Sequence, residues 1–213
     1  LLGSAESSLA ILAQLRAQVL ENRPALLLFG NYNAGKSTLI NLLLDMDTAP
    51  VGDIPLTSSV NAYEWRGIRL LDSPGINAPI THQEITQSEL DKVDLILFVI
   101  RSGDVDEAAQ FEEMARLLAA NKQICIVLNC DSSDPQTVQA WHARLNANLL
   151  HYLPAAGISE QVIDTIPVLP ANLLTATKAR QTNQATLMAM SGFTLVESRL
   201  SWWANEQWQA ARW

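Results

Sequence analysis

The stretch G-N-Y-N-A-G-K-S at residues 30–37 fits the pattern G-x-x-x-x-G-K-[ST] at every fixed position. It follows a short apolar run at residues 25–29, which predicts a buried strand, and it precedes a helical pattern over residues 36–45. Glycines let successive backbone N–H groups of such a loop point at a phosphate, at the positive end of the following helix. The pattern therefore predicts a phosphate-binding loop.

Two side chains of this loop carry most of the expected chemistry. Lys36 is expected to reach the β- and γ-phosphates of a nucleotide, and the Ser37 hydroxyl is expected to ligate Mg²⁺. The predicted phosphate-binding residues are Gly30, Asn31, Tyr32, Asn33, Ala34, Gly35, Lys36, Ser37 and Thr38.

A second motif supports the first. The apolar run at residues 68–72 predicts a strand that ends in the sequence D-S-P-G at residues 72–75. Asp72 at the tip of this strand can hold a water molecule on Mg²⁺, and the Gly75 N–H can contact the γ-phosphate. In the loop between the motifs, Thr57 is the preferred third Mg²⁺ ligand. The competing hydroxyls are those of Thr48, Ser58 and Ser59.

The rest of the pattern alternates strands with helices. Residues 60–65 and 68–72 are joined by two residues, which predicts an antiparallel hairpin, and further buried strands are expected at 95–100, 124–128 and 166–169. Helices are expected at 107–120 and from Pro135 to about residue 152, with Asp134 as the N-cap. Such alternation predicts an α/β fold, a mainly parallel six-stranded sheet with one antiparallel strand and flanking helices.

On these motifs the chain resembles the translation-factor-related class of P-loop GTPases, and within it the Era/TrmE-like and bacterial dynamin-like groups. The resemblance rests on residues 30–41 (G-N-Y-N-A-G-K-S-T-L-I-N), 55–57 (P-L-T) and 71–75 (L-D-S-P-G). It implies a Ras-like sheet, binding of Mg²⁺ with GTP or GDP, and slow GTP hydrolysis coupled to rearrangement of two switch loops. The resemblance covers a GTPase domain at 25–172. Ahead of it, apolar residues at helical spacing predict an N-terminal helix at 1–24, and a helical segment is expected at 173–213.

The base-reading motif departs from that family. Family members carry N-K-x-D after the fifth strand, whereas residues 129–132 here read N-C-D-S. Asn129 matches, Asp131 is a candidate to replace the missing aspartate, and Asp134 is better explained as a helix N-cap. After the last strand, Ala171 and Asn172 are the nearest counterpart of the family's second base-contacting loop. Adenine therefore stays open as an alternative to guanine.

The route to hydrolysis also differs from Ras-like members, because Ile76 stands where they carry a water-orienting glutamine. In TrmE-like members, the asparagine three residues before the P-loop lysine binds K⁺ when two nucleotide domains meet, and Asn33 holds that position. The alternative is that Asn33 only stabilises the turn of its own loop. The residues expected to take part in hydrolysis are Lys36, Thr57, Asn33 and Gly75.

Composition limits the partners. The 213 residues carry a net charge of −8, which argues against tracking of DNA or RNA phosphates. The longest apolar run, residues 95–100, is far shorter than a membrane-spanning helix requires, and two cysteines fit a reducing cytoplasm. Four of the six tryptophans lie within residues 202–213. They suggest a stalk completed by further sequence or a partner surface; the paucity of basic residues there disfavours a membrane.

The first prediction is therefore a Mg²⁺-dependent GTPase switch, with K⁺ stimulation and a homodimer formed through the nucleotide face. Two alternatives stay open at this point. One is a nucleotide-binding scaffold that barely hydrolyses its ligand, and the other is an ATPase built on the same phosphate loop.

Overall fold

A computed structural model describes residues 23–45, 61–72 and 90–210, with side chains described as far as residue 206. The elements are β1 (Ala25–Phe29), α2 (Lys36–Leu44), β2 (Asn61–Trp65), β3 (Ile68–Asp72), β4 (Leu95–Arg101), the 3₁₀ turn η1 (Ser102–Asp104), α4 (Ala108–Ala119), β5 (Gln123–Asn129), α5 (Pro135–Ala155), α6 (Glu160–Ile163), β6 (Val168–Ala171), α7 (Leu173–Gln181), α8 (Ala185–Met190) and α9 (Phe193–Ala210).

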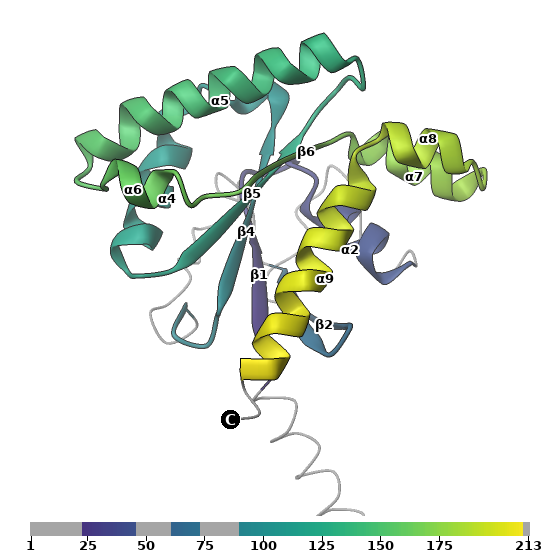
Figure 1. The fold of residues 1–213 in the computed structure, drawn as a ribbon, viewed down its shortest axis with the longest axis horizontal. Coiled ribbons are helices and arrows are strands. Elements are labelled where there is room, and N and C mark those ends of the chain that lie inside the picture. The colour runs from purple at the N-terminus through teal and green to yellow at the C-terminus, as the bar shows by residue number, and fades with distance from the viewer. Residues whose placement is uncertain (1–22, 46–60, 73–89, 211–213) are drawn as a thin grey trace, which may run out of the picture.

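The strands form one six-stranded sheet in the order β2-β3-β1-β4-β5-β6 (Figure 1). Strands β3, β1, β4, β5 and β6 run parallel, and β2 pairs antiparallel with β3. The fold expected from the alternation of strands and helices is thus confirmed. Because β1 lies between β3 and β4, the chain order reverses beside β1, and ligands of open α/β sheets bind outside the carboxyl ends of the strands at such a point.

Two apolar cores cover the two faces of the sheet, because successive side chains of a strand point to opposite sides. On β1, Leu26 and Leu28 join the core that contains α2, α7 and α9, while Leu27 and Phe29 join the core that contains α4 and α5. All five residues of β1 are buried, as expected for a central strand covered on both faces.

Most predicted elements agree with the structure within one residue, and two differ by more. The last strand was expected at 166–169 and is Val168–Ala171, because Ile166 and Pro167 belong to the connection from α6 and the pairing with β5 starts at Val168. Helix α5 continues past residue 152 to Ala155 and includes Pro154. Asp134 is its N-cap, as expected, and its carboxylate accepts a hydrogen bond from the Thr137 N–H at 2.9 Å.

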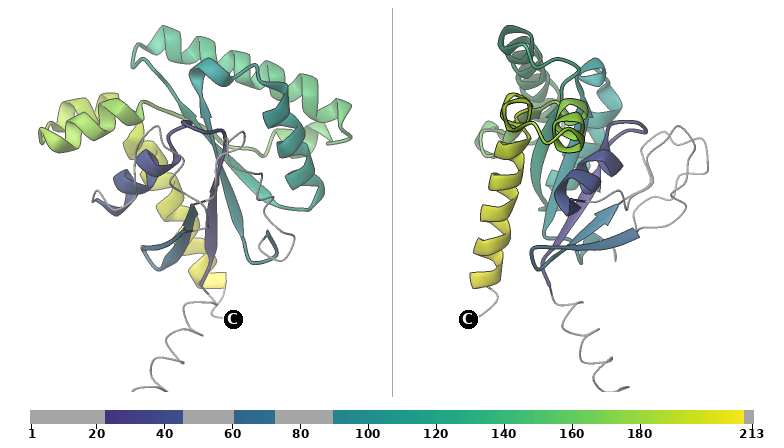
Figure 2. Two further views of the ribbon diagram at one scale, coloured as in Figure 1. Left: turned by 180° about the vertical axis from the view of Figure 1, so that it is seen from behind. Right: turned by 90° about the vertical axis from the view of Figure 1, so that its right-hand side faces the viewer.

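Helix α9 packs along the sheet. Val196, Leu200 and Trp203 form its buried stripe, whereas Trp202 on the other side of the helix is 54% exposed. In Figure 1, α9 begins near the α7–α8 pair and runs down across the sheet, and Figure 2 shows it along one face of the sheet. Arg66, at the tip of the β2–β3 hairpin, also reaches α9, where its guanidinium lies 2.8 Å from the Glu197 carboxylate.

Within the described residues, no helix is both long enough and apolar enough to cross a membrane. Cys125 and Cys130 are both buried and both free thiols.

Candidate functional site

The carboxyl edge of the sheet collects the predicted site residues that the structure describes. In the strand register, Leu28 lies opposite Asp72, Arg101 opposite Asn129, and Asn129 opposite Ala171. The loop at residues 30–35 leaves the same edge from β1 and leads into α2. Parallel strands therefore bring residues up to about 140 positions apart in sequence to one edge.

Two glycines make the loop sterically feasible. Gly30 has a φ of +141°, and a Cβ there would lie 2.2 Å from the carbonyl oxygen of Val99 on β4. Gly35, with a φ of +106°, is the N-cap of α2, and a Cβ there would lie 2.6 Å from Nδ2 of Asn129. A side chain at Gly30 would collide with the backbone of Val99. A side chain at Gly35 would collide with the Asn129 amide, which hydrogen bonds hold in place. The loop therefore packs closely against β4 and β5.

Lys36 is the first residue of α2 and is only 8% exposed. Its ammonium donates hydrogen bonds to the carbonyl oxygens of Gly30 at 3.0 Å and of Asn31 at 2.8 Å, so it lies folded back over the loop. Burial lowers the pKa of Lys36 to about 8, and the nearby Asp72 carboxylate partly offsets this effect. A buried cation held this way is placed to meet an anion in the loop.

Asp72 ends β3 beside Lys36 and is 1% exposed. Burial raises the pKa of this carboxyl to about 6, with Lys36 opposing the shift. Its Oδ1 is buried and has no hydrogen-bond partner within the described part of the chain. An ionised carboxylate oxygen left this way fits a metal ion or a metal-bound water, because burial without such a partner is costly.

Glu107 is a residue of the site that the sequence motifs did not indicate. The side-chain amide of Asn31 in the loop donates a hydrogen bond to the carboxylate of Glu107, the N-cap residue of α4. The two residues are 76 positions apart, and Glu107 belongs to no recognised motif. In the sequence, Glu107 stands directly before a helical pattern. That position indicates the start of a helix and does not indicate a contact with the loop.

Asn129, one of the residues expected to read the base, connects β5 to the loop at residues 30–35. Its Nδ2 donates to the Ala34 carbonyl at 2.9 Å, and its Oδ1 accepts from the Leu173 N–H at 3.3 Å. Asp131 faces the 3₁₀ turn after β4: the hydroxyl of Ser102 lies 3.2 Å from its carboxylate, and Arg101 lies 3.5 Å away. The Asp131 carboxylate is thus held beside the start of that turn.

The other base-side positions have structural contacts of their own. The Asn172 side chain accepts a hydrogen bond from the Thr175 N–H at 2.8 Å and so caps α7. The Cys130 N–H donates to the Ala171 carbonyl at 2.8 Å, and the Cys130 thiol is buried. Ser132, which takes the place of the family aspartate, has a hydroxyl rather than a carboxylate, and that hydroxyl accepts from the Asp134 N–H at 3.0 Å.

Several predicted residues are placed without further detail. Ser37 and Thr38 lie in the first turn of α2, and Asn33 is exposed in the loop with a φ of 61°, a conformation that asparagine tolerates better than most residues. Several other predicted residues lie outside the described ranges: Thr57, the competing hydroxyls of Thr48, Ser58 and Ser59, Gly75, and Ile76.

A glycine-bounded loop between β1 and α2, at the switch point of a parallel sheet and next to a buried carboxylate at the tip of β3, defines a P-loop nucleotide-binding domain of the Ras-like fold. Residues 25–130 match the sequence model of the family described as "50S ribosome-binding GTPase". That segment of the chain belongs to this family, and the chain therefore carries a GTPase domain.

Curated relatives agree with this assignment. The chain is 28% identical over 168 residues to GTPase Der of Moorella thermoacetica, covering 70% of this chain and 38% of that protein. It is 34% identical over 125 residues to the tRNA modification GTPase MnmE of Thermotoga petrophila, covering 53% of this chain and 27% of that protein. The chain thus spans well under half the length of both relatives.

Among solved structures, a protein from an oligomerised bacterial dynamin pair superposes with a TM-score of 0.70 at 15% identity. The match covers 97% of this chain and 50% of that one, so it includes the helices that follow β6. At this identity the likeness shows a shared fold.

Proposed function

We propose that this chain is a Mg²⁺-dependent switch that binds and hydrolyses GTP. The observation that carries the proposal is the position of Lys36, buried over the loop and hydrogen-bonded to the carbonyls of Gly30 and Asn31, with the Asp72 carboxylate beside it. On arrival of a nucleotide, the loop N–H groups and the N-terminus of α2 would hold the β-phosphate while the Lys36 ammonium turns to the β- and γ-phosphates.

We propose Ser37, Thr57 and Asp72 as the residues that hold Mg²⁺. Support comes from the buried, unpartnered Oδ1 of Asp72 and from the position of Ser37 in the first turn of α2. When bound, the ion supplies positive charge to the β- and γ-phosphates. We propose that Gly75 contacts the γ-phosphate through its N–H. Base recognition is assigned to Asn129, Asp131, Ala171 and Asn172.

Potassium stimulation through Asn33 is the finer part of the proposal. Asn33 lies exposed on the loop, where a second copy of the domain could cover it. A K⁺ ion held by Asn33 would supply positive charge to the phosphates. Two nucleotide faces meeting in a homodimer would complete this arrangement, and the bacterial dynamin pair with the same fold is described as oligomerised.

We further propose that the protein acts in the cytoplasm.

The test measures nucleotide binding and phosphate release by the 213-residue chain with Mg²⁺ and either GTP or ATP, in KCl and in NaCl. We expect binding of GTP over ATP, and faster phosphate release in KCl. Lys36→Ala should abolish both binding and release.

The matched variant for K⁺ is Asn33→Gly, because glycine adopts the φ of 61° without strain while the side-chain amide is removed. We expect Asn33→Gly to bind GTP normally and to lose the difference between KCl and NaCl. If the wild type releases phosphate equally in both salts, the K⁺ proposal is wrong while the GTPase proposal stands.

One alternative is an ATPase on the same loop, because Ser132 stands where the family has the aspartate that reads guanine, and the Asp131 carboxylate contacts the Ser102 hydroxyl instead. Tighter ATP than GTP binding in the same experiment would establish it. Binding of GTP without release in either salt would instead indicate a nucleotide-binding scaffold.

A further inference from the structure

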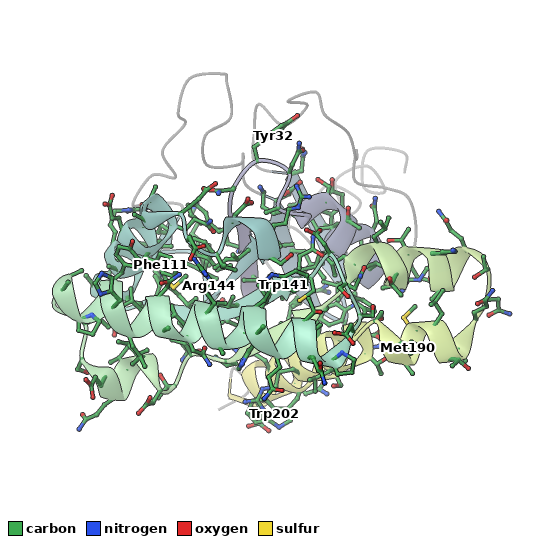
Figure 3. The ribbon with its side chains drawn as sticks, turned by 90° about the horizontal axis from the view of Figure 1, so that it is seen from above. Tyr32, Phe111, Trp141, Arg144, Met190 and Trp202 are labelled. Carbon is green, nitrogen blue, oxygen red and sulfur yellow. The ribbon has the colours of Figure 1, made fainter. Side chains whose placement is uncertain are left out.

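A pocket of about 430 Å³ lies at the opposite end of the sheet from the phosphate-binding loop. It includes Leu95 and Gln123, the first residues of β4 and β5, whereas the loop meets the strands at their carboxyl ends. Seven residues of strand separate the two ends by about 20 Å. In Figure 3, Tyr32 of the loop and Trp202 of α9 lie on opposite sides of the molecule. This pocket is therefore distinct from the nucleotide site.

The walls of the pocket are mainly apolar. Ile124 of β5, Ile166 before β6, and Leu200 and Trp203 of α9 contribute to them, with the exposed indole of Trp202 beside them. Its volume falls in the range of small-ligand sites, roughly 300–1,000 Å³. A ligand that fits must therefore carry an apolar body.

The charges around the pocket have one sign. Lys122 and Arg199 line it, and no aspartate or glutamate does so among the described residues. The Lys122 ammonium is held by the Val93 carbonyl at 3.1 Å. The Arg199 guanidinium lies 5.0 Å from the centre of the Trp202 ring and forms no ion pair within the described ranges. In a chain with a net charge of −8, such a lining favours an anionic group.

Trp203 adds a second polar group without a partner. Its side chain lines the pocket and is only 9% exposed, and its indole N–H has no hydrogen-bond acceptor in the described parts of the chain. Buried donors are rarely left unpaired, because the lost hydrogen bond to water is not replaced. An acceptor oxygen on a ligand would provide the partner that this indole lacks.

We propose that this pocket binds an amphiphilic monocarboxylate. The apolar body lies against Ile124, Leu200 and Trp203, and the carboxylate pairs with the guanidinium of Arg199 at the rim. A carboxylate suits this place because guanidinium binds it through two parallel hydrogen bonds. The proposal does not depend on which nucleotide the other site takes.

The experiment is calorimetric titration of the 213-residue chain with decanoate below its micelle-forming concentration. Decanol and decyltrimethylammonium serve as probes with the same body and no negative charge. We expect saturable one-to-one binding of decanoate, weaker binding of decanol and none of the cationic probe. Absence of saturable decanoate binding, or equal binding of all three probes, overturns the proposal.

Two variants locate the bound probe. Arg199→Gln should weaken decanoate binding about tenfold and leave decanol unaffected. Val162→Trp, which fills the pocket from a position 40% exposed, should abolish the binding of both. The matched control is Arg144→Gln, since Arg144 is an exposed arginine on α5 that pairs with Asp106 outside the pocket lining. If Arg199→Gln binds decanoate like the wild type, the assignment is wrong.

Discussion

Single residues at the carboxyl edge of the sheet owe their properties to how closely the loop packs there. Lys36 and Asp72 are buried side by side, so each shifts the other's titration while burial disfavours the charged form of both. Gly30 and Gly35 permit that burial, because a side chain at either would displace β4 or Asn129. The loop thus packs closely against β4 and β5 at this edge.

Replacement of Gly30 should be costly. A Cβ at this position would lie 2.2 Å from the Val99 carbonyl oxygen, at a φ of +141° that other residues rarely adopt. We expect Gly30→Ala to lower the free energy of unfolding by about 2–4 kcal/mol and to weaken nucleotide binding. Urea denaturation and nucleotide titration measure the two effects. The control is Gly103→Ala, where an added Cβ meets nothing within 4 Å. Equal stability of the two variants would contradict the steric argument.

The raised pKa of Asp72 predicts how the ligand-free protein responds to pH. The pKa rises from 3.8 to about 6 on folding, so the folded state holds the proton more tightly than the unfolded state. Protonated Asp72 therefore stabilises the folded state. This stabilisation is fully present below about pH 4 and is lost as the pH rises through about 6. The loss amounts to at most about 3 kcal/mol.

The measurement is urea unfolding at several pH values between 4 and 7, with EDTA and without nucleotide. We expect Asp72→Asn to lose less stability than the wild type over this range, because asparagine does not titrate. Parallel stability curves for the two proteins would show that Asp72 ionises as freely in the folded state as in the unfolded one.

Two helices near the phosphate-binding loop begin at residues whose side chains also lie close to the candidate site. Asn172 caps α7 directly after β6, and Glu107 stands at the start of α4 while it accepts a hydrogen bond from Asn31. A capping side chain satisfies a backbone N–H that the helix leaves free. Positions that resemble base-reading residues in the sequence can therefore have a structural role.

For Asn172 the structural role can be measured. Asn172→Ala removes the acceptor of the Thr175 N–H, and we expect a loss of about 1 kcal/mol in unfolding free energy. Asn172→Ser retains an N-cap oxygen and should recover most of this loss. Chemical denaturation gives the stabilities. If Asn172 acts mainly on the base, both variants should instead weaken GTP binding equally and unfold like the wild type.

In the whole molecule, the helices after β6 share one apolar core with the sheet. Phe193, Val196 and Leu200 of α9 pack in the cluster that also contains Leu26 and Leu97 of the central strands. A domain boundary at residue 172 would therefore divide a common core. The division into a GTPase domain at 25–172 and a separate segment at 173–213 stays a prediction. This packing also forms one wall of the pocket at the amino ends of β4 and β5.

Truncation of Phe193 tests whether α9 folds with the sheet. Phe193 is 1% exposed, so we expect Phe193→Ala to cost about 3–5 kcal/mol, with a single cooperative unfolding transition. Leu195→Ala, at a position 57% exposed on the same helix, should change stability by less than about 0.5 kcal/mol. Fluorescence and circular dichroism during urea unfolding give the two values. Separate transitions would mean that α9 is an independent unit.

The sequence by itself determined the parts of this protein whose chemistry is local. A phosphate-binding loop needs its glycines, lysine and hydroxyl in consecutive positions between a strand and a helix, so residues 30–37 carry the whole signal. The strand ending at Asp72 and the N-cap at Asp134 are local in the same sense. The alternation of apolar runs was enough for the sheet and its two covered faces.

Only the tertiary structure decided which distant residues meet. The hydrogen bonds from Asn31 to Glu107 and from Asn129 to the Ala34 carbonyl join positions 76 and 95 residues apart. No periodicity of the sequence encodes such pairs, because they depend on strand order and register. The same holds for the contact of α9 with the sheet and for the pocket beside Arg199, where side chains from β4, β5 and α9 come together only after folding.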